Sequence, residues 1–196
     1  MTERWPADPS HIARAAERLR AGAVIAFPTD TLYGVGARAA DPAAVDRLYQ
    51  VKRRPPEQPM VWLVTDRAPV ERFAVVSAAA AELMERFWPG PLTLVLPARL
   101  RTGGSTIAVR APNHDVALAL LTALGEPITS SSANPAGQPP PVEADQVIAA
   151  LGDALDVVLD GGPCRIGQPS TILDLTGATP RILRQGAIPS SELISR

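Results

Sequence analysis

Hydroxyl and carboxyl side chains gather directly after the first strongly apolar run of the sequence. Residues 28–37 read PTDTLYGVGA and bring Thr29, Asp30 and Thr31 together behind the apolar residues 23–28. Because α/β sheets bind ligands where their strands end, this segment is a candidate site. The alternative is a tight turn whose Thr and Asp side chains satisfy its own backbone. The GVG sequence at 34–36 lacks the third glycine and the following helix of a dinucleotide fingerprint, which excludes that motif.

Positive charge gathers at residues 52–59, KRRPPEQP. Prolines after three adjacent cations predict a stiff, extended segment that suits phosphate or carboxylate recognition, with Arg as a fork and Lys as a point charge. The alternative is a helix C-terminus, where the macrodipole favours cations in any case. Lys52 is the single lysine among 19 basic residues. Either position 52 requires a compact ammonium, or the lysine is there by chance in an arginine-rich sequence.

Two further polar segments follow predicted strands. Residues 129–137, TSSSANPAG, offer hydroxyls, an amide and backbone N–H groups to an oxyanion. Residues 167–175, GQPSTILDL, place Ser170 where a turn passes into a strand. Only two histidines are present and neither is tied to the serines, so the pattern argues against an acyl-serine mechanism. His114 fits a helix cap or first-turn surface position better than a catalytic base.

The absence of other motifs narrows the chemistry. No Walker A sequence occurs, so any nucleotide is bound without a P-loop. One cysteine, Cys164, excludes an internal disulfide framework and a cysteine-built metal site, and we expect no protein-bound metal. A net charge of −1 argues against nucleic-acid binding through bulk charge. Without a signal-peptide or membrane-spanning apolar run, the sequence predicts a soluble cytoplasmic protein.

The elements that must position these groups alternate along the chain. Helical spacing and caps predict helices after Ser10, after Asp41, from Asp66, after Ser77, after Asn113, at 143–151 and after Ser190. Apolar runs predict strands at 23–28, 60–64, 92–97, 106–110, from 127, and near 155–159, 170–175 and 180–184. Segments 98–105, 133–141 and 161–169 are predicted to be exposed loops.

This order predicts an α/β or mixed α+β fold in a single domain over residues 1–196. A hydrophobic content of 46% is enough for a sizeable core. Several neighbouring strands, such as 92–97 and 106–110, have no helix between them. A mixed, twisted sheet therefore fits better than a parallel doubly wound one.

Taken together, the motifs resemble those of the YrdC family, over about residues 10–188. They are PTDTLYGVGA, the Lys-x-Arg of Lys52 and Arg54 with Pro55, Gln58 and Pro59, WPGPLTLVLP (88–97), TIAVRAPNH (106–114), SSSANPAG (130–137), LDGG (159–162), STILDL (170–175) and LRQG (183–186). The resemblance implies a twisted mixed sheet, flanked by helices, around a central positively lined cavity. The chain resembles the short, single-domain form of the family.

The resemblance also implies an activity, that of a threonylcarbamoyl-AMP synthase. Such an enzyme converts L-threonine, bicarbonate and ATP with Mg²⁺ into L-threonylcarbamoyladenylate and pyrophosphate, without a prosthetic group. Downstream threonylcarbamoyl-transferase proteins then pass the group to adenosine 37 of transfer RNA, so a weak contact with transfer RNA is also expected.

Site residues carry over position by position. The resemblance implies that Lys52, Arg54, Ser132 and Asn134 form the catalytic set. Threonine would be held by Thr31, Arg110, Ser130 and Ser170, with Arg110 as a fork for its carboxylate. ATP would be held by Lys52, Arg54, Gln58, Thr106, Ser132 and Arg184.

Three positions depart from the family pattern. Leu63 stands where many members have a histidine, which bears on selectivity between serine and threonine. Pro140-Pro141-Val142 replaces the usual Ser-Pro-Thr and removes a hydroxyl that would meet the nucleotide. Arg184-Gln185-Gly186 replaces Arg-Pro-Gly and keeps the charge.

Two other functions remain open at this point. One is a non-catalytic module that grips double-stranded RNA or a transfer-RNA stem, although the near-zero net charge disfavours it. The other is a carbamoyl-transfer domain of the same fold, which usually belongs to longer chains with additional modules.

Overall fold

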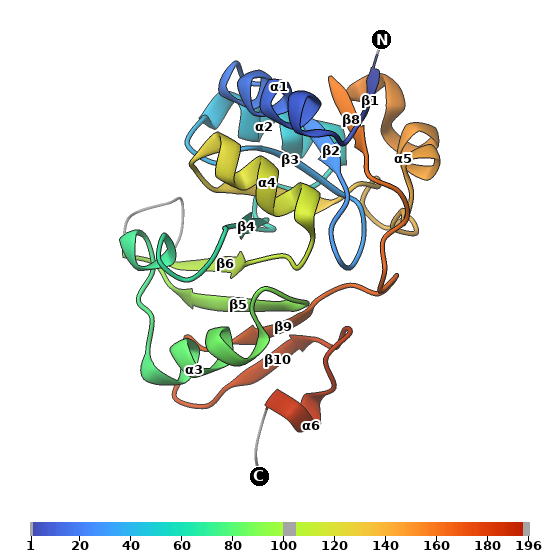
Figure 1. Ribbon diagram of the computed structural model, residues 1–196. Coiled ribbons are helices and arrows are strands. Elements are labelled where there is room, and N and C mark those ends of the chain that lie inside the picture. The colour runs from blue at the N-terminus through green and yellow to red at the C-terminus, as the bar shows by residue number, and fades with distance from the viewer. Residues whose placement is uncertain (1, 100–104, 194–196) are drawn as a thin grey trace.

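A computed structural model describes residues 2–99 and 105–193 and contains one ten-stranded sheet flanked by helices (Figure 1). The strands are β1 (Glu3–Pro6), β2 (Ile25–Phe27), β3 (Gly34–Arg38), β4 (Val61–Leu63), β5 (Leu92–Pro97), β6 (Thr106–Arg110), β7 (Ile128–Ser132), β8 (Val157–Asp160), β9 (Thr171–Asp174) and β10 (Arg181–Arg184). The helices are α1 (Pro9–Arg20), α2 (Pro42–Lys52), α3 (Ala78–Phe87), α4 (Asp115–Leu124), α5 (Ala144–Leu151) and α6 (Ser190–Leu193), with 3₁₀ turns η1 (Val70–Arg72) and η2 (Gly152–Ala154).

The sheet mixes parallel and antiparallel pairs, as the sequence predicts. Its strand order is β1-β8-β2-β3-β7-β4-β6-β5-β9-β10. The pairs β1·β8, β2·β8, β4·β6 and β5·β9 are parallel, and the other five are antiparallel. The two central strands, β7 and β4, pair with β3 and β6, respectively. The loop that follows β2 contacts the end of β6 through Thr31 and Arg110, and it contacts the segment that follows β8 through Asp30 and Ile166.

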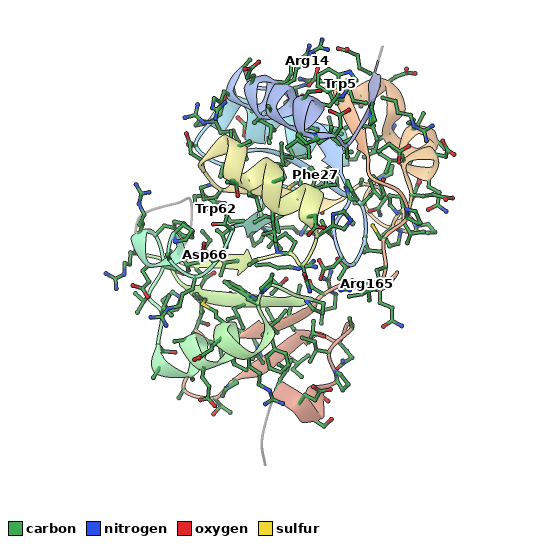
Figure 2. The ribbon with its side chains drawn as sticks, in the orientation of Figure 1. Trp5, Arg14, Phe27, Trp62, Asp66 and Arg165 are labelled. Carbon is green, nitrogen blue, oxygen red and sulfur yellow. The ribbon has the colours of Figure 1, made fainter. Side chains whose placement is uncertain are left out.

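Three hydrophobic clusters hold the helices on the sheet. α1 and α4 lie side by side and share the first cluster with β2 and β8 (Figure 1). α2 and α5 share the second cluster with residues of β2, β3 and β8. Along β2 and β8, these residues alternate with the residues that belong to the first cluster. α3 packs over β5 and β6 in the third. At the β1 edge, the Arg14 guanidinium lies 4.3 Å from the centre of the Trp5 ring. Both residues are labelled in Figure 2.

Helix starts show where side-chain caps were predicted correctly and where they were not. Asp41 and Ser77 cap α2 and α3 through the N–H groups of Ala44 and Ala80. The prediction that Ser10 caps the first helix was wrong, because the Asp8 carboxylate accepts from the N–H groups of Ser10 and His11. A carboxylate interacts more favourably than a hydroxyl with the positive end of a helix.

Other corrections concern the second half of the chain and the short helix from Asp66. His114, rather than Asn113, caps α4 by accepting the N–H of Val116 at 3.3 Å, which confirms the capping interpretation of this histidine. In place of the helix predicted from Asp66, the structure has a turn and then η1. Part of the loop predicted at 98–105, residues 100–104, lies outside the described residues. Within the described ranges, no helix is long and apolar enough to cross a membrane.

Two strands were missed. β1 has a short alternating pattern whose pairing partner, β8, lies about 150 residues away. β3 contains Gly34 and Gly36, which predict a turn rather than a strand. A Cβ on Gly36 would lie 2.5 Å from Ile128 Cγ2 and 2.9 Å from the Thr129 carbonyl oxygen. Glycine is needed here because β7 and its side chains pass too close for any other residue.

Candidate functional site

The loop between β2 and β3 forms the floor of a cavity of about 600 Å³. Thr29, Asp30 and Thr31 are each at most 4% exposed. The Thr29 hydroxyl accepts from the N–H groups of Thr31 and Leu32 and donates to the Leu32 carbonyl at 2.7 Å. Thr29 thus satisfies the turn, as the structural alternative proposed. Thr31, by contrast, points its hydroxyl toward a buried arginine.

That arginine is Arg110, the last residue of β6. Its Nε donates to the Gly90 carbonyl at 3.0 Å, its Nη1 to the Thr31 hydroxyl at 2.9 Å, and its Nη2 to Asp30 Oδ1. Arg110 is 6% exposed and lines the cavity. Burial lowers the pKa of the guanidinium, and the Asp30 carboxylate opposes that shift. Three of its five N–H groups are occupied by the protein, which leaves one on each Nη atom for a ligand.

On one side of β6, the strand β4 gives this pocket an apolar lining residue. Leu63 of β4 pairs in register with Arg110 on one side and with Ile128 of β7 on the other. It is 4% exposed and lines the cavity, next to the arginine fork. The departure at position 63 therefore places a branched apolar side chain, in place of an imidazole, beside the candidate carboxylate site.

The opposite wall comes from β5, β9 and β10. The hydroxyls of Thr93 and Ser170 lie 2.8 Å apart and both are buried. Arg184 donates to the Ser170 carbonyl from Nε at 3.1 Å and from Nη2 at 2.9 Å, and Nη2 also reaches the Ser170 hydroxyl at 3.2 Å. All three residues line the cavity. The two hydroxyls and the guanidinium thus form one connected polar wall.

The cationic segment 52–59 forms a turn rather than the predicted extended segment. Arg53 caps α2 in the left-handed region with φ 49°, which reverses the chain. Arg54 then donates from Nε to the Gln58 carbonyl at 2.9 Å and from Nη2 to the Pro59 carbonyl at 3.0 Å. The reversal separates Lys52 from Arg54, and only Arg54 lines the cavity.

Lys52 lies behind the wall of the cavity, against the residues that follow β7. Its ammonium donates to the backbone carbonyls of Ser132 and Asn134. It is 2% exposed, and burial, helped by the charge of Arg54, lowers its pKa to about 8. Ser132 and Asn134, which the sequence places with it in the catalytic set, do line the cavity.

The segment 161–169, predicted to be an exposed loop, also contributes to the floor. The N–H groups of Ile166 and Gly167 donate to the carbonyls of Asp30 and Thr31 at 2.9 and 3.0 Å. Cys164 is buried, and burial raises the pKa of its thiol to about 11. The segment therefore backs the loop that carries Thr31, with Arg165 at the surface (Figure 2).

Most of the predicted site residues meet in one place. The cavity is lined by Thr31, Arg54, Gln58, Arg110, Ser130, Ser132, Asn134, Ser170 and Arg184. Lys52 is outside this lining, and so is Thr106, which is exposed at the start of β6 and pairs with Pro97. Of the six predicted ATP ligands, Arg54, Gln58, Ser132 and Arg184 thus line the cavity, and Lys52 and Thr106 do not.

Sequence reasoning missed some lining residues. Thr93 interrupts the apolar run LTLVLP, and a polar residue inside a predicted core strand is a signal that could have identified it. Pro140 lines the mouth of the cavity, at the position where the family usually has a serine. Tyr33 was not missed, because its hydroxyl belongs to the predicted candidate segment 28–37; it lines the cavity, and its hydroxyl donates to the Gly162 carbonyl at 2.9 Å.

Three arginines line the cavity, Arg54, Arg110 and Arg184, against one carboxylate in the same lining, that of Glu57. Burial lowers the pKa of Arg184, and the charge of Arg54 adds to that shift. Arg184 in turn helps to lower the pKa of Arg110. Cations that depress one another's pKa values in this way favour binding of an anion between them. Asp30, which pairs with Arg110, offsets part of this charge.

A mixed sheet with a pocket lined by arginines, hydroxyls and an amide is suited to small anionic ligands. The comparisons with known proteins agree on which protein family this is. The family model Sua5_yciO_yrdC, described as telomere recombination, matches residues 17–186. The chain belongs to this family, which confirms the assignment made from its motifs.

Relatives extend the match to nearly the whole chain. A Pyrococcus abyssi protein named threonylcarbamoyl-AMP synthase is 42% identical over 91% of this chain and 55% of its own length. A Vibrio vulnificus protein of the same name is 32% identical over 90% of this chain and 99% of its own. The crystal structure of P. abyssi Sua5 complexed with L-threonine superposes with a TM-score of 0.92 at 38% identity, covering 100% of this chain and 60% of that one. The chain thus spans little more than half of the P. abyssi protein.

Proposed function

We propose that this chain is a threonylcarbamoyl-AMP synthase, a nucleotidyltransferase that converts L-threonine, bicarbonate and ATP into threonylcarbamoyl-adenylate, pyrophosphate and water. The observation that carries the proposal is the Arg110 fork, buried with Thr31 at the floor of a cavity whose rim bears Arg54 and Arg184. One end suits an amino-acid carboxylate and the other suits a polyphosphate. Family membership and the names of the relatives support the same reaction.

At the amino-acid end, the carboxylate would accept the two free N–H groups of Arg110, one on each Nη atom. Ser130, whose hydroxyl has only a 3.5 Å contact with the Ser131 carbonyl, is available to the ligand. The Ser170 hydroxyl faces the same space from the opposite wall. Leu63 provides an apolar surface, which suits a substrate that carries a methyl group.

At the nucleotide end, Arg54, Arg184, Gln58 and Ser132 would hold the phosphates. Arg54 uses two of its five N–H groups within its own turn, which leaves three for phosphate oxygens. Mg²⁺ enters with the triphosphate as part of the substrate. A cavity of about 600 Å³ is in the range of pockets for ligands of this size.

The chemistry needs two bond changes. The threonine amine forms a C–N bond to the carbon of bicarbonate with loss of water, and an oxygen of the resulting carbamate attacks the α-phosphorus while the bond to pyrophosphate breaks. The residues at the cavity supply fixed cations and hydrogen-bond donors rather than an acid–base pair. Catalysis would therefore rest on positioning and on stabilisation of the charge that develops on the phosphates. The product would pass to the proteins that transfer its threonylcarbamoyl group to transfer RNA.

The test is amino-acid-dependent release of pyrophosphate. The protein is incubated with ATP, Mg²⁺ and bicarbonate, and each candidate amino acid is added in turn. We expect release that requires both threonine and bicarbonate. Release without threonine, or retention of RNA on a filter with no turnover, would contradict the proposal.

A further inference from the structure

The single lysine of the chain is directed at backbone rather than at the cavity. The Lys52 ammonium donates to the carbonyls of Ser132 and Asn134 and lies 3.5 Å from Asn134 Oδ1. The Lys52 carbonyl accepts the N–H of Ala136 at 3.1 Å. Both ends of this residue therefore bind one turn, residues 132–138, which is 80 or more positions further along the chain.

The turn closes on itself through Asn134. Its side-chain Nδ2 donates to the Pro135 carbonyl at 3.0 Å and to the Gln138 carbonyl at 2.6 Å. Asn134 thus joins the ammonium on one side to the end of the turn on the other. Ser132, Asn134 and Gln138 all line the cavity, so the position of the turn sets the position of one wall.

These contacts explain why a lysine stands here in a chain that uses arginine at every other basic position. An ammonium presents three N–H groups from a single atom and can serve carbonyls that converge on one point. A guanidinium spreads its donors over a plane, so it is less suited to acceptors that converge on one point.

We infer that Lys52 is a positioning residue that clamps the 132–138 turn against the end of α2, and that Arg54 is the phosphate ligand of the pair. The inference rests on the proposed function for the identity of the nucleotide, while the clamp itself is a property of the free protein. Arg54 lines the cavity and retains free N–H groups, whereas the donors of Lys52 are directed at backbone carbonyls.

The clamp is tested first in the wild-type protein. Because Lys52 is the single lysine, protein grown on isotope-labelled lysine gives one side-chain ammonium signal in NMR without any assignment variant. At pH 6.5 we expect its protons to be protected from exchange with water in the free protein and to keep that protection when pyrophosphate is added. Protection that appears only with pyrophosphate would overturn the inference.

The second test compares Lys52→Met with the matched control Arg54→Met. Hydrogen exchange of residues 133–138 in the free proteins should rise about tenfold or more in Lys52→Met and stay unchanged in Arg54→Met. By calorimetry, Lys52→Met should weaken ATP and AMP by similar factors, whereas Arg54→Met should weaken ATP far more than AMP. A Lys52→Met variant with unchanged exchange and a loss specific to ATP would make Lys52 a phosphate ligand and overturn the clamp.

Lys52→Gln guards against a Met variant that fails to fold. Its amide is neutral but still offers two N–H groups to the carbonyls, so it should recover part of the exchange protection. If Lys52→Met folds and Lys52→Gln shows the same hydrogen exchange as Lys52→Met, the clamp is contradicted. If neither variant folds, the wild-type NMR measurement decides, and an ammonium that exchanges freely with water contradicts the clamp. If the wild-type protein binds no nucleotide, the proposed function fails, and the NMR and exchange results still decide the clamp.

Discussion

Replacing Arg110 by lysine keeps the charge and removes the fork. Nε and the two Nη atoms of Arg110 reach three protein acceptors, on Gly90, Thr31 and Asp30, which leaves two N–H groups for the proposed carboxylate. A lysine side chain is one bond shorter and carries its donors on one atom. It can pair with Asp30 or with the ligand, but it cannot serve the Gly90 carbonyl and the Thr31 hydroxyl as well.

Two costs follow from the structure. The loss of one of two parallel bonds to a carboxylate removes about 1.5–3 kcal/mol of binding, because hydrogen bonds to charged groups are worth that much. At 1.4 kcal/mol per tenfold, the threonine requirement should rise by about 10- to 150-fold. The Gly90 carbonyl would be left unpaired, which should also lower the free energy of unfolding by about 1–3 kcal/mol, whereas the Thr31 hydroxyl keeps its 3.0 Å hydrogen bond with the Thr29 hydroxyl.

The assay is pyrophosphate release with threonine titrated at saturating ATP, for wild type and Arg110→Lys at 25 °C. Thermal unfolding of both proteins shows that the variant is folded at the assay temperature. The ATP requirement, measured at saturating threonine, should change by less than about threefold. Superimposable threonine curves in a folded variant would refute the carboxylate role of Arg110. They would leave it as the buried partner of Asp30.

Four other changes test other parts of the structure. Thr93→Val removes the hydroxyl that pairs with Ser170 and should raise the threonine KM about fivefold, or about 1 kcal/mol, with Thr93→Ser restoring it; an unchanged KM would show that the pair does not position Ser170. Gly36→Ala places a Cβ against β7 and should lower the free energy of unfolding by about 1–3 kcal/mol in denaturant titrations, whereas unchanged stability would mean that the strands separate easily. Arg53→Gly relieves the left-handed backbone at the end of α2 and should raise that free energy by about 0.5–1 kcal/mol, while Arg53→Val should lower it; the opposite order would contradict the observed turn. The pKa of Lys52 is lowered to about 8 from 10.5 for a free lysine, so between these pH values the unfolded chain binds more protons than the folded one. The free energy of unfolding of wild type, relative to that of Lys52→Met, should therefore rise by up to about 3 kcal/mol from pH 8 to 10.5. A difference that does not change with pH would contradict burial of the ammonium.

Local patterns were enough to predict the parts of the fold whose cause is local. Asp41 and Ser77 cap their helices because their side-chain oxygens accept backbone N–H groups of the first turn that have no partner within the helix. The first helix shows the limit of the rule, since Asp8 and Ser10 are both good caps and the carboxylate competes more strongly for the positive end of the helix. β3 could not be predicted from its own residues. Gly36 is dictated by Ile128 and Thr129, which the chain brings alongside only when it folds.

The sequence was enough to predict which segments form the site, but not which of their side chains point into the cavity. The motifs place Thr31, Arg110 and Ser170 at strand ends, and the sheet order brings those ends together. Which way a side chain points depends on the backbone on either side of it. The left-handed residue Arg53 sends Lys52 behind the wall and Arg54 into the cavity, although the two are separated by a single residue. Thr106 was predicted to bind ATP from its place in a motif, but it lies at the start of β6, where it is exposed.

The central claim is that this chain joins threonine, bicarbonate and ATP in one cavity, and the product itself tests it most directly. The protein is incubated with ATP, Mg²⁺, threonine and isotope-labelled bicarbonate, and the nucleotides formed are separated rapidly and analysed by mass spectrometry. The account predicts an adenylate that carries both the threonine side chain and the label from bicarbonate, formed together with pyrophosphate. An adenylate of threonine without the label, or no adenylate at all from folded protein, would contradict it.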